Sequence, residues 1–112
     1  APLVSLTFEL LQEGQFQLIF LARAVNARRN TGAFAYVVAK RPGDFSKLAA
    51  AEHENLRLLH ERAPDHVVRP YRGGRVILFD RRLGDGPREV YAYLTQWLGS
   101  HHELGVARNL QF

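Results

Sequence analysis

The sequence has 112 residues, of which 46% are hydrophobic, and it contains no cysteine. These values indicate one domain with a modest core and exclude intrinsic disorder, disulfides, cysteine zinc sites and thiol nucleophiles. The net charge of +4 comes mainly from dispersed arginines, which we interpret as solvated strand ends and not as a nucleic-acid-binding surface. No apolar run reaches the roughly 18 residues that a membrane helix needs. With no signal peptide in the sequence, we expect a cytoplasmic protein without a membrane partner.

The first predicted elements are three strands joined by hairpins. Apolar and polar residues alternate from Val4 to Leu11, and a more apolar run extends from Phe16 to Val25. A tight turn with Gly14 at its tip is expected between them. After a polar loop, the run Ala33–Ala39 is rich in Val, Tyr and Phe and is followed by Pro-Gly, which favours a central strand. Lys40 therefore ends a central strand, either as a solvated residue or as a cation aimed at a bound anion.

A long helix is predicted from Phe45 to Ala63, with Asp44 or Ser46 capping its first turn. Apolar residues recur at helical spacing and predict the buried stripe of this helix: Leu48, Ala51, Leu56, Leu59 and Ala63. Two histidines, His53 and His60, lie seven residues apart on the helix, but no third ligand has the spacing of a zinc site. We therefore expect one long helix and no metal site.

The remaining sequence predicts further strands. The strands are Val67–Tyr71, Arg75–Arg81 and Glu89–Leu98. A turn over 72–74 separates the first two, and a hairpin turn over 83–87 precedes the last. The tail from Ser100 to Phe112 has apolar residues at near-helical spacing. The predicted order is three strands, one helix and two or three further strands. This order makes an α+β fold, a five- to six-stranded antiparallel sheet with one long helix across it.

This order, together with four segments, resembles the N-terminal lobe of the protein-kinase-like fold, which protein kinases share with aminoglycoside and choline kinases. Leu11–Leu18 is similar to the phosphate-covering loop, and Val37–Lys40 to the strand that carries the nucleotide lysine. His66–Pro70 resembles the strand after the helix, and Tyr93–Leu98 the last strand with the hinge between lobes. The resemblance covers about 95 residues, from Leu6 to Leu98.

The resemblance implies a nucleotide site. Lys40 would contact the α- and β-phosphates of ATP and pair with a helix glutamate, Glu54, with Glu52 as the alternative. Thr95 would guard the back of the pocket. The other implied nucleotide-binding residues are Gly14, Gln15 and Phe16 in the loop, and Gln96 and Leu98 at the hinge.

The chain departs from the family pattern in two respects. Only Gly14 remains of the three loop glycines of active protein kinases, with Gln12 and Gln17 at the outer positions, which favours the small-molecule kinase branch. The chain also lacks the His-Arg-Asp-like loop and the metal-binding residues of a C-terminal lobe. We therefore expect a single domain, residues 1–112, that is the ATP-binding lobe of a larger Mg²⁺-dependent phosphotransferase and is catalytically silent alone. Residues 99–112 would form a tail or the start of the interlobe segment.

A second hypothesis is a free-standing α+β module that binds protein or nucleic acid without catalysis. In either case, three strands have apolar residues at both odd and even positions, so that both of their faces are apolar: residues 18–21, 34–38 and 76–79. A sheet with this pattern needs cover on both faces, and one helix covers only one. We therefore expect the chain to form a homo-oligomer through the second face or through its C-terminal segment, unless a C-terminal lobe covers that face.

Overall fold

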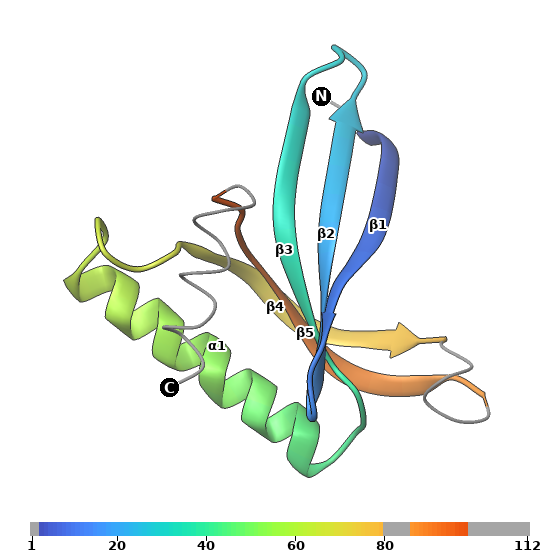
Figure 1. Ribbon diagram of the computed structural model, residues 1–112, viewed down its shortest axis with the longest axis vertical. Helices are drawn as coiled ribbons and strands as arrows, with labels where there is room; N and C mark the ends of the chain where they lie inside the picture. The colour runs from blue at the N-terminus through green and yellow to red at the C-terminus, as the bar shows by residue number, and fades with distance from the viewer. Residues whose placement is uncertain (1–2, 80–85, 99–112) are drawn as a thin grey trace.

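The computed structural model describes residues 3–79 and 86–98. Its strands form a five-stranded antiparallel sheet in the order β1-β2-β3-β5-β4, with one helix against it (Figure 1). The elements are β1 (Leu3–Glu13), β2 (Gln17–Asn26), β3 (Thr31–Ala39), α1 (Asp44–Arg62), β4 (Pro70–Leu78) and β5 (Arg88–Gln96). This architecture confirms the α+β class. The expectations for the turn at 83–85 and for the tail 99–112 lie outside the described residues.

The first three strands form two consecutive hairpins, as expected. Across them Leu10 pairs with Phe20, and Phe20 pairs with Tyr36. The β2–β3 turn is closed by the side chain of Asn26, whose oxygen accepts the backbone N–H groups of Arg28 and Asn30 at 3.0 Å. An Asn side chain that bonds nearby backbone groups is a common turn device. The hairpin projects beyond α1 at the top of Figure 1.

The start of α1 differs from the expected cap. Gly43 is the N-cap residue, with φ of 73°, and no side chain caps the helix, so the prediction of Asp44 or Ser46 is wrong. Ser46 has another role: its Oγ donates to the carbonyl oxygen of Arg41 at 2.9 Å and accepts the backbone N–H of Tyr91 at 3.1 Å. The helix start is therefore fastened to β5.

The helix packs on β3, β4 and β5, and of the predicted apolar stripe Leu56 is buried there. Ala49 and Leu56 are buried, whereas Leu48 and Leu59 are 54% and 51% exposed. Glu52 lies on the inward side with Ala49 and Leu56, which are three and four residues away and so share its face. The predicted stripe is therefore right for Leu56 and wrong for Leu48 and Leu59, because the polar residues Glu52 and His53 face the sheet and form hydrogen bonds with its tyrosines.

Residues 70–78 form one strand where the sequence predicted two strands and a turn. Pro70 pairs with Thr95 and Gly73 pairs with Tyr93, so three steps on β4 match two on β5 and the ladder is bulged. A Cβ atom at Gly73 would lie 2.6 Å from both His53 Nδ1 and Tyr91 Oη. Glycine is present here because helix and sheet approach closely, and not because the chain reverses.

The core lies between α1 and the central strands, with Val37, Leu56, Val90 and Tyr93 among its buried members. Beyond the helix, β1 forms the edge of the sheet, and Phe8 on it remains 52% exposed. Within the described residues, no helix is long and apolar enough to cross a membrane.

Candidate nucleotide-binding site

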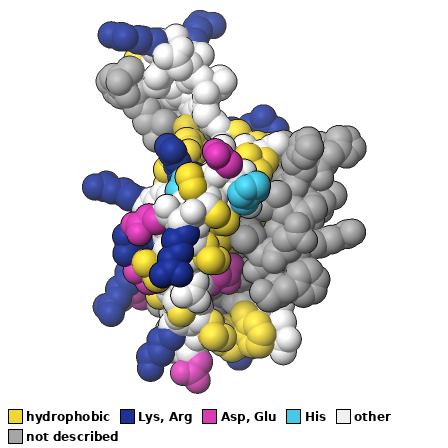
Figure 2. All heavy atoms as spheres, turned by 90° about the vertical axis from the view of Figure 1, so that its left-hand side faces the viewer, with side chains coloured by type: hydrophobic (Ala, Val, Ile, Leu, Met, Phe, Trp, Pro, Cys, Tyr) yellow, Lys and Arg dark blue, Asp and Glu magenta, His cyan; other side chains and the backbone are white. Residues whose placement is uncertain are grey.

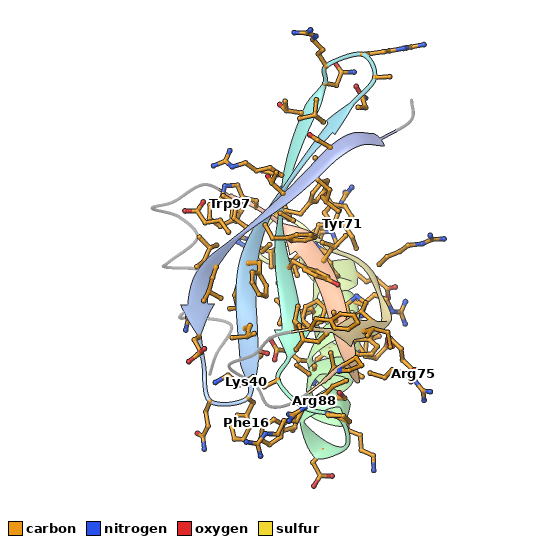
Figure 3. All side chains as sticks on the ribbon, turned by 90° about the vertical axis from the view of Figure 1, so that its right-hand side faces the viewer. Phe16, Lys40, Tyr71, Arg75, Arg88 and Trp97 are labelled. Atoms are coloured by element: carbon orange, nitrogen blue, oxygen red, sulfur yellow. The ribbon has the colours of Figure 1, made fainter. Side chains whose placement is uncertain are left out.

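Lys40 directly follows β3 and is tied to the β1–β2 turn by two contacts. Its backbone N–H donates to the carbonyl oxygen of Phe16 at 3.0 Å. Its ammonium Nζ lies 3.9 Å from Oε2 of Glu13, and the two side chains are 17% and 46% exposed. Figure 3 shows Lys40 and Phe16 at the same end of the sheet. The structure therefore brings the candidate lysine and the candidate loop together.

The turn itself, residues 14–16, is short and anchored. The backbone N–H of Gly14 donates to the carbonyl oxygen of Gln17 at 2.8 Å, and Gln15 is exposed. The ring of Phe16 meets the ring of Phe45 edge to face, with centroids 5.1 Å apart, so the turn also rests on the start of α1. Exposed turn residues therefore lie beside a lysine that is 17% exposed, and this is the candidate position for an anionic ligand.

The structure does not bring Glu54 to Lys40. Glu54 is exposed and accepts two hydrogen bonds from the Arg57 guanidinium, the shorter at 2.7 Å. This hydrogen bonding is the main cause that lowers the pKa of the Glu54 carboxyl. Glu54 lies on the outer face of α1, two positions from the inward Glu52, because successive helical residues are turned by about 100°.

Glu52 points to the sheet but has a different partner. It accepts the hydroxyl proton of Tyr93 at 2.7 Å. Tyr93 is 1% exposed, and burial is the main cause that raises the pKa of its hydroxyl, followed by the negative charge of Glu52. Neither helix glutamate forms an ion pair with Lys40 within the described residues, where the carboxylate beside Lys40 belongs to Glu13.

Sequence reasoning missed a polar cluster around His53. The Nε2 atom of His53 donates to the carbonyl oxygen of Tyr71 at 2.7 Å, and Nδ1 lies 2.7 Å from the Tyr91 hydroxyl. Because a carbonyl oxygen only accepts, Nε2 carries the proton, and in the neutral ring Nδ1 accepts from Tyr91. The imidazole also stacks on Tyr93, with centroids 4.7 Å apart. The cluster joins α1 to β4 and β5.

A signal for this cluster was present in the sequence. Tyr91 and Tyr93 are two residues apart on β5 and so lie on the same face of the strand. His53 and Glu52 lie on the helix turn that packs against this face. From the sequence, His53 is considered only as a potential metal ligand. No group of three metal-ligating side chains occurs in the part of the chain that the structure describes.

The residues at the end of β5 lie apart from Lys40. Thr95 is 6% exposed and pairs with Ala35, five residues before Lys40 on the neighbouring strand. That separation is about 16 Å along a strand at roughly 3.3 Å per residue. The backbone N–H of Gln96 donates to the carbonyl oxygen of Arg69 at 2.8 Å, so this group is already paired. Leu98 is partly exposed.

An open groove of about 380 Å³ lies elsewhere, between the start of α1 and strands β4 and β5. Its lining includes Ser46, Lys47, Arg75 and Glu89. Arg75 and Glu89 form an exposed ion pair at 3.3 Å, so part of the positive charge there is neutralised. None of the predicted nucleotide-binding residues lines this groove.

Comparison of the chain with known protein families, curated proteins and solved structures gives no match. The functional assignment therefore depends on the residues and their geometry.

Proposed function

We propose that this chain is the ATP-binding lobe of a kinase-like phosphotransferase whose catalytic groups belong to a C-terminal lobe. The observation that carries the proposal is Lys40, a half-buried cation at the end of the central strand β3, fixed to the Gly14 turn by a backbone hydrogen bond. The order of three strands, one helix and two strands is the order on which the family resemblance depends. An ATP-dependent lobe of this kind fits a cytoplasmic location.

The chemistry of these residues suits a phosphate chain. The Lys40 ammonium would attract the α- and β-phosphates, and the exposed turn residues would lie over them. Thr95 lies on the neighbouring strand β5, about 16 Å from Lys40 along the sheet, and the base would have to extend over that distance to reach it. Mg²⁺ supplies charge neutralisation at the β- and γ-phosphates when the nucleotide is bound. Acceptor binding and proton removal belong to the C-terminal lobe.

One observation favours the second candidate, a module that binds a polyanion. The sequence has no acidic residue from Gly14 to Gly43, and Arg23, Arg28 and Arg29 on the β2–β3 hairpin are exposed. None of the three makes a side-chain ion pair within the described residues. Figure 2 shows Lys or Arg side chains at the end of the projecting part. Positive charge of this kind attracts nucleic acid or an acidic protein surface.

A titration with ATP tests the first proposal. ATP should bind with a dissociation constant in the near-millimolar range, because one lobe buries little of the ligand. Lys40→Ala should raise that constant about tenfold or more, since a charge-assisted contact to phosphate is lost. Arg62→Ala, at the exposed end of α1, is the control and should leave it unchanged. NMR chemical shifts of the 12.7 kDa chain give both constants.

Equal affinity for ATP in wild type and Lys40→Ala would contradict the assignment of Lys40. In a protein that includes the C-terminal lobe, the same substitution should abolish phosphoryl transfer with little loss of stability. If polyanion binding, lost on substitution of Arg28 and Arg29, were found without ATP binding, the second candidate would stand instead.

A further inference from the structure

Within the described residues, Glu13 is the carboxylate that pairs with Lys40, and it directly precedes the turn that would cover the phosphates. The Lys40 Nζ to Glu13 Oε2 distance is 3.9 Å. Glu13 is the last residue of β1, immediately before Gly14. Hydrogen bonds from Lys40 N–H to Phe16 and from Gly14 N–H to Gln17 fix the backbone on both sides. The two charges are therefore held near each other by the backbone as well as by their own attraction.

The helix carboxylates do not balance the Lys40 charge. Glu52 accepts from the Tyr93 hydroxyl, and Glu54 accepts from the Arg57 guanidinium. A phosphate that approaches Lys40 thus meets the negative charge of Glu13 at the same cation. Two negative groups that compete for one ammonium repel each other, and the repulsion lowers the affinity for the incoming one.

We propose that Glu13 occupies Lys40 in the free protein and must be displaced by the nucleotide phosphates, so that Glu13 sets the affinity of the site for phosphate-bearing ligands. This inference rests on the proposed nucleotide site and adds a residue that the family resemblance does not name. The Glu13 side chain is nearly half exposed, so water still reaches its carboxylate when phosphate takes its place at Lys40. The competition is electrostatic, so it applies to the triphosphate part of ATP and not to the base.

Two ligands and four proteins, wild type and three variants, test the proposal. ATP and inorganic tripolyphosphate are titrated into wild type, Glu13→Gln, Lys40→Ala and the double variant, and chemical shifts of residues 13–18 and 40 are followed. Glu13→Gln should lower the dissociation constant of both ligands about two- to fivefold, the range expected for one partly exposed ion pair. The gain should shrink as salt concentration rises. The double variant should bind as weakly as Lys40→Ala.

Glu9→Gln is the control, because Glu9 is exposed on the same strand and forms no ion pair within the described residues. It should bind both ligands as wild type does. Thermal unfolding of each variant establishes that the fold is kept. If Glu13→Gln binds like wild type while Lys40→Ala binds more weakly, the competition is refuted and the nucleotide site stands. If Lys40→Ala binds like wild type, or if no variant binds either ligand, both the competition and the site are refuted.

Discussion

The Tyr93 side chain is buried, and its hydroxyl donates a hydrogen bond to Glu52, while His53 stacks on its ring. Burial and the adjacent carboxylate both disfavour the ionised phenolate, so the pKa of Tyr93 is raised in the folded protein. Burial also raises the pKa of Tyr91 and Tyr36. Tyr91 and Tyr93, which bond to His53 and Glu52 of α1, therefore link the packing of the helix to the stability of the fold at alkaline pH.

Tyr93→Phe should change stability in two ways. At neutral pH it removes a hydrogen bond to a carboxylate and should lower the free energy of unfolding by about 1–3 kcal/mol. Above pH ~10 the unfolded tyrosine ionises whereas the folded one keeps its proton. The raised folded pKa thus gives a contribution that is complete below pH ~10 and is lost as pH rises further. Wild type should lose stability steeply above that pH, and Tyr93→Phe less steeply.

Urea unfolding at a series of pH values from neutral to alkaline measures both effects. Tyr71→Phe is the control, because Tyr71 takes part in the His53 cluster through its carbonyl oxygen and its side chain is 40% exposed. The same alkaline slope in Tyr93→Phe and wild type would contradict the account of Tyr93.

At the scale of elements, the sequence predicted the three N-terminal strands, the long helix and the last strand from periodicity and turn residues, with boundaries within about two residues. It split β4 at Gly73-Gly74, because two adjacent glycines are typical of a turn. It also left open which glutamate faces the sheet, since the apolar stripe indicated by Leu48 and Leu59 is out of phase with the buried one. Which face of the helix turns to the sheet is decided by partners on the sheet, such as Tyr93 for Glu52. The local sequence pattern of the helix does not contain these partners.

Gly73→Ala should destabilise the fold. The added Cβ would lie 2.6 Å from both His53 Nδ1 and Tyr91 Oη, so one side of their hydrogen bond has to move. We expect a loss of about 1–3 kcal/mol in the free energy of unfolding, as for overpacked sites. Gly74→Ala is the matched control, because nothing lies within 4 Å of the added atom. Equal stability of the two variants, measured by urea unfolding, would show that helix and sheet do not approach closely at Gly73.

At the scale of the molecule, the helix covers β3, β4 and β5, while β1 and its neighbours extend beyond it (Figure 1). Leu6, Phe8 and Leu10 on β1 are 47%, 52% and 37% exposed. The Phe8 ring lies 5.5 Å from that of Tyr36, centroid to centroid, so the exposed side chains continue an apolar surface across the strands. A long apolar edge strand is a site at which another chain can pair or pack.

We therefore expect the 112-residue chain to associate with a second copy at micromolar concentration. Burial of apolar surface at ~25 cal/mol per Å² drives the association. Phe8→Lys, which puts a charge in the middle of the exposed strand, should shift the equilibrium to monomer without change in circular dichroism. Sedimentation equilibrium of wild type at 12.7 kDa would contradict this expectation and show that the surface on β1 is no interface.

The central claim, a nucleotide site at Lys40, is tested most directly by the location of bound ATP on wild type. Amide chemical shifts recorded during the titration map that location residue by residue. With the phosphates bound at Lys40, the largest shift changes should lie at Gly14, Phe16 and Lys40, with smaller ones near Thr95. Shift changes confined to the hairpin residues 28–29, or to the groove at Lys47 and Arg75, with the amide shift of Lys40 unchanged, would contradict a nucleotide site at Lys40.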